Sequence, residues 1–534
     1  MPADQLYQAV APFSEHFNLC SYYLDQNVEK GRAGKVALIH GERTQTFGEL
    51  AERVTRLSAF LRHAGVRPEE RILLILPDGF EFAEAFFACL RVGGVFCMVN
   101  PLLKADALQY YLEYTKARVV LTHADVLPEL SAAARASRFC ETVLVSCGDA
   151  GGFTPYEEAL GSFACDDPQA FVECTGPDDL AGWLFTSGST GQPKACVHTH
   201  ADFAWSTETY ALRVVGYEEA DRCLSVPKLF FGYATGTNLM FPFRVGASAV
   251  LFSGRSTAEE LFDQIEAHRP TLLTSVPTMI NNMLRSPRCE ETDLSSLRVC
   301  LSAGEALPPK LYQEWKERTG VEILDGIGSA EMFHIYISNY PGDVKLGSLG
   351  KIVPGYEARI IDEEGQEVPT GEPGRLRVRG GSTALCYWGD KEKSREAFQG
   401  EWCTSADIFH RDDDGYYFYE GRCDDLLKVS GIWTSPLEIE NALLEHPAVQ
   451  EVCVVGCAGA DNLVKPLAFC VLREGQVGDE ALAAELKVWL KGRLAPHKYP
   501  RWFEWRAELP KNDRGKIARK ILKEDLLARG STRT

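Results

Sequence analysis

A short segment at positions 186–194 combines the residue types that bind phosphate. It holds four hydroxyl side chains, two glycines and a lysine, and it follows an apolar run at 183–185. Glycines let a backbone approach a ligand closely, so that N–H groups, hydroxyls and a lysine charge can surround phosphate oxygens. The Walker A spacing does not fit, and a Ser/Gly linker is not expected inside a strand–helix pattern. The candidate residues are Thr186, Ser187, Gly188, Ser189, Thr190, Gly191 and Lys194.

The elements around this segment alternate between apolar runs and helical patterns. Three short runs rich in Val, Ile and Leu predict buried strands, at 35–40, 72–77 and 119–122. Positions 47–63 carry leucine and valine at helical spacing, which predicts an amphipathic helix. Such alternation predicts an α/β fold in which helices cover largely parallel sheets.

The chain is too long for one hydrophobic core. It has 534 residues, whereas single cores usually stop growing near ~250–300 residues. Gly and Pro turns separate short alternating runs at about 348–420, which predicts a small, mostly β subdomain. We expect a large N-terminal domain that includes this subdomain, followed by a smaller C-terminal domain.

Charge is unevenly distributed along the chain. The net charge is −19, yet the stretch from Asp425 to the end holds 17 Lys and Arg against 15 Asp and Glu. The acidic average argues against nucleic-acid binding. A mildly basic C-terminal domain suits a lid over an anionic ligand, although a solvated basic helix is the commoner explanation of a charge run.

The cysteines and the N-terminus predict a cytoplasmic protein. The 17 cysteines lack the paired spacings of zinc sites, so we interpret them as buried thiols in a reducing compartment. The first residues lack the basic region and apolar core of a secretory signal. The most apolar region, 83–103, is interrupted by Arg, Gly, Asn and Pro, so we expect no membrane partner.

The phosphate-binding segment fits, at every position, the [ST]-S-G-[ST]-T-G-x-P-K signature of the adenylate-forming superfamily. This superfamily includes acyl- and aryl-CoA ligases, peptide-synthetase adenylation domains and luciferases. Later segments resemble its further signatures in the expected order: 304–306, 326–331, Asp407 after 402–404, the hinge segment 421–428, and 510–517. The resemblance therefore covers nearly the whole chain.

The resemblance implies a two-step reaction with ATP, Mg²⁺ and coenzyme A. A carboxylate attacks the α-phosphate of ATP and pyrophosphate leaves; the thiolate of coenzyme A then attacks the acyl-adenylate and AMP leaves. Both first reactants are anions, so the site must supply positive charge. The implied catalytic residues are Lys516, Glu331, Thr190 and Lys194, with Glu331 linked to Mg²⁺ and Lys516 bridging carboxylate and phosphate oxygens.

Other residues are implied to bind the nucleotide or to allow movement. The resemblance makes Asp424 the expected hinge, about which the C-terminal domain rotates between adenylation and thioesterification. It therefore implies an N-terminal domain, 1–423, and a small, mobile α+β C-terminal lid domain, 424–534. Gly431 and Trp433 are candidates for the pantetheine channel of coenzyme A. The nucleotide-binding candidates outside the phosphate-binding segment are Gly304, Glu305, Ala306, Asp325, Gly326, Ile327, Asp407 and Arg422.

Two positions depart from the superfamily pattern. Ile327 stands where an aromatic residue usually stacks on adenine, and Ala330 stands where a threonine hydroxyl usually contacts the phosphate or its metal. The missing hydroxyl corresponds to a loss of ~1–2 kcal/mol. Ser329 and Thr190 are nearby hydroxyls that compensate in this interpretation.

Three segments, at 228–236, 329–335 and 382–388, closely resemble benzoate-CoA ligases. The resemblance implies an aryl pocket formed by Phe231, Gly232, Tyr233, Ile327, Gly328 and His334. Benzoate-CoA ligases place Ala where Gly232 stands, so a ring substituent would have room here. We expect a benzoate-type acid, with 2-aminobenzoate as the leading candidate; His334 is either ring packing or a polar contact.

Three alternatives remain open from the sequence. A stand-alone adenylation enzyme would load the acid onto a phosphopantetheinyl carrier protein instead of coenzyme A. Luciferase-type oxygenation fits a benzoate-like pocket less well. A nucleotide-binding switch would keep the phosphate loop but would not need Lys516 and Glu331. The oligomeric state is not indicated.

Overall fold

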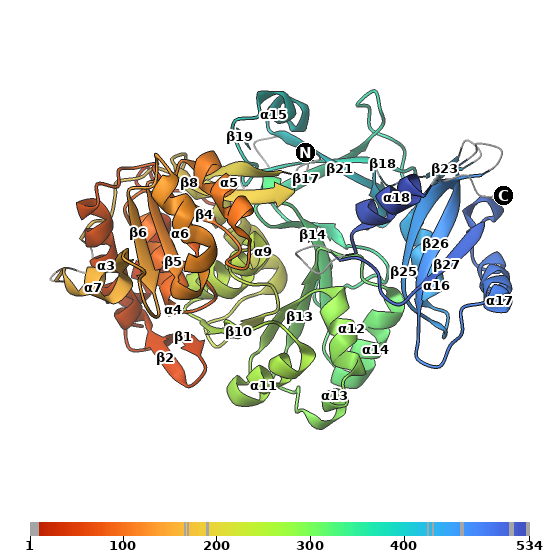
Figure 1. Ribbon diagram of the computed structural model, residues 1–534, viewed down its shortest axis with the longest axis horizontal. Helices are drawn as coiled ribbons and strands as arrows, with labels where there is room; N and C mark the ends of the chain where they lie inside the picture. The colour runs from red at the N-terminus through yellow and green to blue at the C-terminus, as the bar shows by residue number, and fades with distance from the viewer. Residues whose placement is uncertain are drawn as a thin grey trace. The chain divides into compact units, whose positions relative to one another are not determined.

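The computed structural model describes residues 10–164, 167, 170–187, 192–423, 425, 427–429, 432–459, 464–511 and 517–529 (Figure 1). The chain forms two compact units. The first comprises Met1–Leu307, Leu311–Ala358 and Val378–Cys403, and the second comprises Pro308–Lys310, Arg359–Arg377 and Thr404–Thr534. The predicted hinge, Asp424, lies outside the described residues, so the boundary at 423/424 stays a prediction.

An eight-stranded sheet forms one half of the first unit, in the order β19-β9-β8-β4-β3-β5-β6-β7. Its inner strands are parallel, and β8, β9 and β19 pair antiparallel at one edge. The strands are β3 (Arg71–Ile75), β4 (Val95–Met98), β5 (Val119–His123), β6 (Thr142–Ser146), β7 (Thr154–Pro155), β8 (Leu180–Ser187), β9 (Pro193–Thr199) and β19 (Cys386–Tyr387).

Helices accompany the eight-stranded sheet. Apolar side chains of α5 and α6 share a core with its strands, and Figure 1 shows both helices lying over β4, β5 and β6. The helices are α3 (Phe47–His63), α4 (Phe80–Arg91), α5 (Ala105–Thr115), α6 (Leu127–Ala136), α7 (Tyr156–Gly161) and the 3₁₀ turn η2 (Ala124–Val126). The predicted helix at 47–63 is confirmed, since a capping box of Thr46 and Glu49 fixes its start.

A nine-stranded sheet forms the other half of the first unit, in the order β16-β15-β14-β13-β12-β10-β11-β1-β2. The five strands from β14 to β11 run parallel, with β1 alongside. The strands are β1 (Val36–His40), β2 (Arg43–Thr46), β10 (Arg222–Ser225), β11 (Ser248–Leu251), β12 (Leu272–Ser275), β13 (Val299–Ala303), β14 (Ile323–Gly328), β15 (Ile335–Ser338) and β16 (Lys351–Ile352).

Helices α11, α12 and α14 share a core with the nine-stranded sheet. The helices of this half are η1 (Ser21–Asp25), α2 (Gln26–Glu29), α8 (His200–Ser206), η3 (Thr207–Val215), α9 (Gly232–Thr235), η4 (Gly236–Met240), α10 (Phe241–Val245), α11 (Ala258–His268), α12 (Pro277–Arg285), α13 (Arg288–Glu291), α14 (Pro309–Thr319) and η5 (Ala330–Met332).

The predicted β subdomain corresponds to a five-stranded sheet. Its strands are β17 (Tyr356–Ile361), β18 (Gly374–Gly380), β20 (Phe398–Gln399), β21 (Trp402–Arg411) and β22 (Tyr417–Arg422), with α15 (Lys391–Ala397) before β20. The division between the two compact units runs through β17, β18 and β21.

The C-terminal part of the second unit is α+β, as predicted. Alternate residues of β25 enter two cores, one shared with α16 and α17 and the other with α18. Its elements are β23 (Leu427–Val429), β24 (Ile432–Thr434), α16 (Pro436–Leu444), β25 (Val449–Ala458), β26 (Val464–Leu472), α17 (Glu480–Lys491), η6 (Pro496–Lys498), β27 (Trp502–Arg506) and α18 (Arg519–Ala528). Among the described residues, no helix combines the length and apolarity needed to cross a bilayer.

Candidate active site

The phosphate-binding segment lies in a β-hairpin at the edge of the eight-stranded sheet. Strands β8 and β9 pair antiparallel, with Thr186 opposite Lys194 and Ser187 opposite Pro193. The hairpin therefore brings the two ends of the segment together, and α8 follows directly after β9. The four residues between them that were predicted to contact phosphate, Gly188, Ser189, Thr190 and Gly191, lie outside the described residues.

Tyr387 connects two predicted catalytic residues. Its hydroxyl donates a hydrogen bond to Glu331 Oε1 at 2.7 Å, and the Lys194 ammonium lies 3.4 Å from the centroid of its ring. Burial, and next the Glu331 carboxylate, raise the pKa of Tyr387, so the hydroxyl keeps its proton and donates. Lys194 and Glu331, which were predicted from separate motifs, therefore belong to one cluster.

The turn that carries Glu331 is held by its carbonyl groups. It is the 3₁₀ turn η5, which follows β14 of the nine-stranded sheet. His198 Nε2 donates to the Ala330 carbonyl at 2.7 Å and the Ala384 N–H donates to the Glu331 carbonyl at 2.8 Å. The Ser382 hydroxyl donates to the Met332 carbonyl at 2.8 Å. The turn that carries Glu331 is thus held by His198 of β9 and by two residues just before β19.

His198 is itself held by a buried carboxylate. Its Nδ1 lies 2.8 Å from Asp202 Oδ2, and both side chains are buried. Asp202 also accepts hydrogen bonds from the Thr199 N–H and hydroxyl, at 3.2 and 2.7 Å. Since the Ala330 carbonyl can only accept, Nε2 carries a proton and the ring orientation is fixed. The sequence motifs did not identify His198, Asp202 or a role for Tyr387.

A strained residue separates the Glu331 turn from the predicted aryl pocket. Phe333 has φ 62° and ψ −58°, and the His334 N–H donates to the Met332 carbonyl at 2.7 Å. This is the geometry of a γ-turn that non-glycine residues rarely adopt, at a cost of ~1–3 kcal/mol. The turn reverses the chain within the two residues between Glu331 and His334. One short segment therefore carries both a predicted Mg²⁺-linked carboxylate and a predicted aryl-pocket residue.

The predicted aryl-pocket residues come from the start of α9, from the end of β14 and from His334, which lies between η5 and β15. His334 Nε2 donates to the Tyr233 carbonyl at 3.1 Å, and its ring packs 5.3 Å from that of Tyr233 and 4.6 Å from that of Phe241. A Cβ atom at Gly328 would lie 2.5 Å from the His334 carbonyl, so only glycine fits. Phe231 precedes α9 as its N-cap, and Ile327 pairs with Ile337 of β15.

The structure has room for a Cβ atom at Gly232. A Cβ atom there would meet Leu184 at 3.4 Å and the Phe333 carbonyl at 3.8 Å, which are ordinary van der Waals distances. The buried Tyr233 hydroxyl and His334 Nδ1 have no hydrogen-bond partner in the described part of the chain. Burial lowers the pKa of His334 to about 3, so the ring is neutral and serves as an aromatic wall with one free acceptor atom.

We expect the pH dependence of stability to reveal the neutral His334. Its pKa is about 3 in the folded state against an unfolded value of ~6.5, so its contribution is present above pH ~6.5 and is lost as the pH falls toward ~3. The free energy of unfolding, measured with urea between pH 7 and 4, should therefore fall less steeply in His334→Phe than in the wild type. The exposed His63 provides the control: an equal change of slope in His63→Phe contradicts the assignment.

The predicted nucleotide-binding motifs meet at the carboxyl ends of two adjacent parallel strands. Ser302 pairs with Asp325 and Ala303 with Gly326, so that 304–306 leaves β13 beside the end of β14. Glu305 accepts hydrogen bonds from the N–H and hydroxyl of Thr278, at 3.0 and 2.8 Å. Burial raises the pKa of Asp325 to about 8. Ligands of open α/β sheets bind at this edge.

The second unit brings together Asp407 and Arg422, which are opposite each other on β21 and β22. Lys511 and Ile517 form an isolated antiparallel bridge on either side of the segment that contains Lys516. Lys516, Asp424 and Gly431 lie outside the described residues, and only the backbone of Trp433, in β24, is described. Their predicted roles stay predictions.

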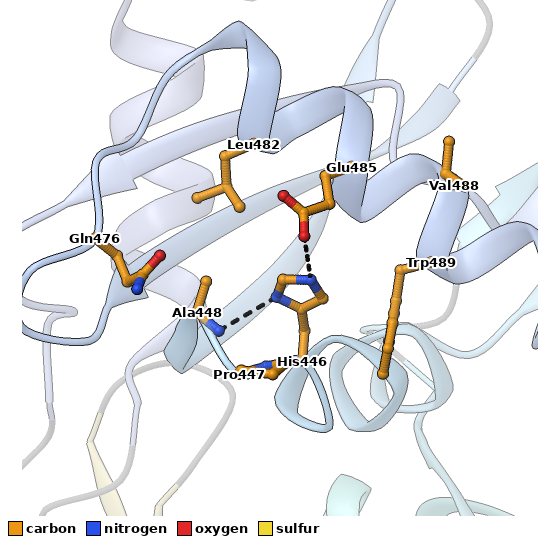
Figure 2. Close-up of a pocket in the computed structure, with 8 residues that line it drawn as sticks. All are labelled: His446, Pro447, Ala448, Gln476, Leu482, Glu485, Val488 and Trp489. Atoms are coloured by element: carbon orange, nitrogen blue, oxygen red, sulfur yellow. Dashed lines mark hydrogen bonds and ion pairs between the residues drawn. The ribbon is translucent and has the colours of Figure 1, made fainter.

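A surface pocket of about 380 Å³ in the second unit contains none of these residues (Figure 2). His446 Nε2 lies 3.4 Å from Glu485 Oε1, and its Nδ1 accepts a hydrogen bond from the Ala448 N–H at 3.2 Å. Figure 2 shows the side chains of His446 and Glu485 between α16 and α17, beside Trp489. The motifs that predict the reaction therefore do not point to this pocket.

The two-sheet first unit, the phosphate-binding hairpin and the α+β C-terminal unit are those of an adenylate-forming enzyme. The AMP-binding enzyme family matches residues 24–388, and the AMP-binding enzyme C-terminal domain matches residues 438–516. The chain belongs to the AMP-binding enzyme family. The predictions of the superfamily, of the α/β fold and of an AMP-forming acid–thiol ligase are confirmed.

The chain is similar to relatives over nearly its whole length. It is 42% identical to the benzoate–CoA ligase of Thauera aromatica, over 95% of each chain. The crystal structure of the anthranilate CoA ligase AuaEII with anthranoyl-AMP has a TM-score of 0.92 and 38% identity, covering 99% of both chains. A benzoate CoA ligase from Burkholderia xenovorans LB400 has a TM-score of 0.86 and 42% identity, covering 95% of this chain and 99% of that one.

Proposed function

We propose that the chain is an ATP-dependent aryl-CoA ligase for a benzoate-type acid, either benzoate or a substituted benzoate such as 2-aminobenzoate. It converts the acid and ATP to an aryl-adenylate and pyrophosphate, and then transfers the aryl group to coenzyme A with release of AMP. The observation that carries this proposal is the full-length similarity to both benzoate and anthranilate ligases.

Glu331 is the residue that we expect to hold Mg²⁺. Its Oε1 accepts the Tyr387 hydroxyl, whereas no described residue is hydrogen-bonded to its other oxygen. Mg²⁺ is typically bound by one or two carboxylates together with substrate phosphates. No group of three or more His, Cys, Asp and Glu residues suited to a metal occurs among the described residues, which fits a metal shared with the substrate. When bound, Mg²⁺ supplies positive charge against the triphosphate.

The other charges of the site come from lysines. Lys194 lies on β9 close to the turn of the phosphate-binding hairpin, where its ammonium can neutralise phosphate oxygens. Lys516 is proposed to neutralise the carboxylate and α-phosphate oxygens as they approach. The aromatic side chains around His334 provide an apolar wall for the ring of the acid.

Gly232 is proposed to make room for a ring substituent. Gly232→Ala adds one methyl group at ordinary contact distance from Leu184, so the fold should tolerate it. We expect kcat/KM for 2-aminobenzoate to fall relative to benzoate by ~10–200-fold, the range for one methyl-sized change in a pocket. Steady-state assays with both acids measure this ratio.

Gly161→Ala is the matched control for Gly232→Ala, since a Cβ atom there meets nothing within 4 Å. It should leave the ratio of kcat/KM values unchanged. If Gly232→Ala also leaves the ratio unchanged, Gly232 does not determine which benzoate is used.

A substrate panel tests the proposed function. We expect kcat/KM for benzoate, 2-aminobenzoate or a hydroxybenzoate to exceed that for hexanoate, and free coenzyme A to serve as the acceptor. A preference for hexanoate contradicts the aryl assignment. Transfer to a phosphopantetheinyl carrier protein but not to coenzyme A would instead support the stand-alone adenylation enzyme.

A further inference from the structure

Tyr387 lies between the two opposite charges of the phosphate site. The Lys194 ammonium lies over the face of its ring, and its hydroxyl donates a hydrogen bond to the Glu331 carboxylate. Within the described part of the chain, neither Lys194 nor Glu331 forms an ion pair. Both charges nonetheless act on the same neighbour: burial and then Glu331 raise the pKa of Cys403, while Lys194 opposes the shift.

A direct contact between Lys194 and Glu331 would compete with the substrate. Each charge would satisfy the other, and both would have to separate before a phosphate oxygen or a cation could bind. An aromatic face is a weaker partner for an ammonium group than an anion is, and a single hydroxyl leaves one carboxylate oxygen available. Tyr387 therefore satisfies both charges without neutralising either.

The surrounding structure fixes the direction of the Tyr387 side chain. Strand β19 pairs with β9, which places Tyr387 opposite Cys196, and the Tyr387 N–H donates to the Ser394 hydroxyl at 3.0 Å. Its ring packs against Phe398 with centroids 5.1 Å apart, and the residue is 6% exposed. Strand pairing and packing thus fix the direction of the Tyr387 hydroxyl independently of its hydrogen bond to Glu331.

We propose that Tyr387 is a positioning residue that keeps Lys194 and Glu331 apart and oriented, Glu331 toward Mg²⁺ and Lys194 toward the triphosphate. This inference rests on the proposed function only in so far as the enzyme binds ATP with Mg²⁺. It requires no assumption about which acid is activated or which thiol accepts it.

The test is the Mg²⁺ dependence of ATP binding, measured by calorimetry on the full chain without acid or coenzyme A. Tyr387→Phe keeps the ring but removes the hydroxyl that orients Glu331. Loss of one hydrogen bond to a charged group corresponds to about a tenfold to hundredfold effect, so the Mg²⁺ concentration for half-maximal ATP binding should rise by about tenfold or more. Binding of AMP without Mg²⁺ should be unchanged.

Two further variants separate the hydroxyl from the ring. Tyr387→Leu also removes the support of Lys194, so ATP binding should remain weakened at saturating Mg²⁺, whereas Tyr387→Phe should recover there. In a Glu331→Gln background, Tyr387→Phe should have no additional effect on the Mg²⁺ dependence, because the hydroxyl acts through the Glu331 charge. If the effects of the two substitutions on the Mg²⁺ dependence of ATP binding are fully additive, the proposal is overturned.

Tyr114→Phe is the matched control. Its half-buried hydroxyl donates to the Trp388 carbonyl at 2.7 Å, one residue from Tyr387, and accepts from the Ala195 N–H at 3.2 Å, but it does not contact Glu331. We expect a lower melting temperature and an unaltered Mg²⁺ dependence. An unchanged Mg²⁺ dependence in Tyr387→Phe, or an equal shift in both variants, overturns the proposal. Failure of the aryl assignment would leave all these binding measurements unaffected.

Discussion

Lys516→Ala should abolish aryl-adenylate formation while thiolysis of supplied aryl-adenylate persists. The first half-reaction joins two anions, the carboxylate and the α-phosphate of ATP, so it depends on positive charge placed where they meet. One well-placed charge or donor of this kind contributes ~3–4 kcal/mol, a factor of about a hundred to a thousand in rate. In the second half-reaction the thiolate attacks a carbonyl that is already activated, so we expect this lysine not to be required.

The two half-reactions can be measured separately. Pyrophosphate release with ATP and the aryl acid reports the first, and AMP release from chemically prepared aryl-adenylate with coenzyme A reports the second. Lys520→Ala is the control, because Lys520 lies in the following helix α18 and is largely exposed. An equal loss of both half-reactions in Lys516→Ala contradicts the proposed division of labour.

Glu331→Gln should reduce adenylate formation by about a hundredfold or more. The amide oxygen of glutamine can still accept the Tyr387 hydroxyl, so the turn at η5 should keep its conformation. The negative charge that is proposed to hold Mg²⁺ is lost, and with it electrostatic stabilisation of the size expected for one charged group. Pyrophosphate release should recover only in part as Mg²⁺ is increased.

A surface carboxylate provides the comparison for Glu331→Gln. Glu141 is largely exposed and pairs with Arg118 at 2.6 Å, a type of contact that contributes little to stability. Glu141→Gln should retain the wild-type rate and Mg²⁺ dependence. Wild-type pyrophosphate release by Glu331→Gln at low Mg²⁺ would exclude Glu331 as the metal-linked carboxylate.

Local elements were largely predictable from the sequence, but their partners were not. The helix at 47–63 was predicted with its observed bounds, because its apolar spacing is a local signal. The structure adds the capping box of Thr46 and Glu49 that fixes its start. The strands before and after it belong to different sheets: β1 pairs with β11, and β3 with β4 and β5. Pairing with a strand that lies some two hundred residues away depends on tertiary packing, which hydrophobic periodicity does not report.

The sequence motifs identify candidate residues that are proposed to contact the substrate directly. Positions 304–306 and 326–331 resemble superfamily signatures, and the structure places β13 and β14, which lead into them, side by side. His198 and Asp202 support the Glu331 turn through the Ala330 carbonyl and belong to no recognised motif. Tyr387 lies in the recognised segment 382–388, but the resemblance assigns no role to it. The sequence holds no signal for such support, since it depends on the contact between β9, β19 and the turn η5.

The product balance of one reaction shows whether the chain is an aryl-CoA ligase. The purified chain is supplied with ATP, Mg²⁺, coenzyme A and either benzoate or 2-aminobenzoate, and pyrophosphate, AMP and the aryl-CoA thioester are quantified. We expect the three products to form in equal amounts and pyrophosphate release to require the aryl acid. Release of no pyrophosphate with any benzoate, or of pyrophosphate without a matching amount of aryl-CoA, would contradict this assignment.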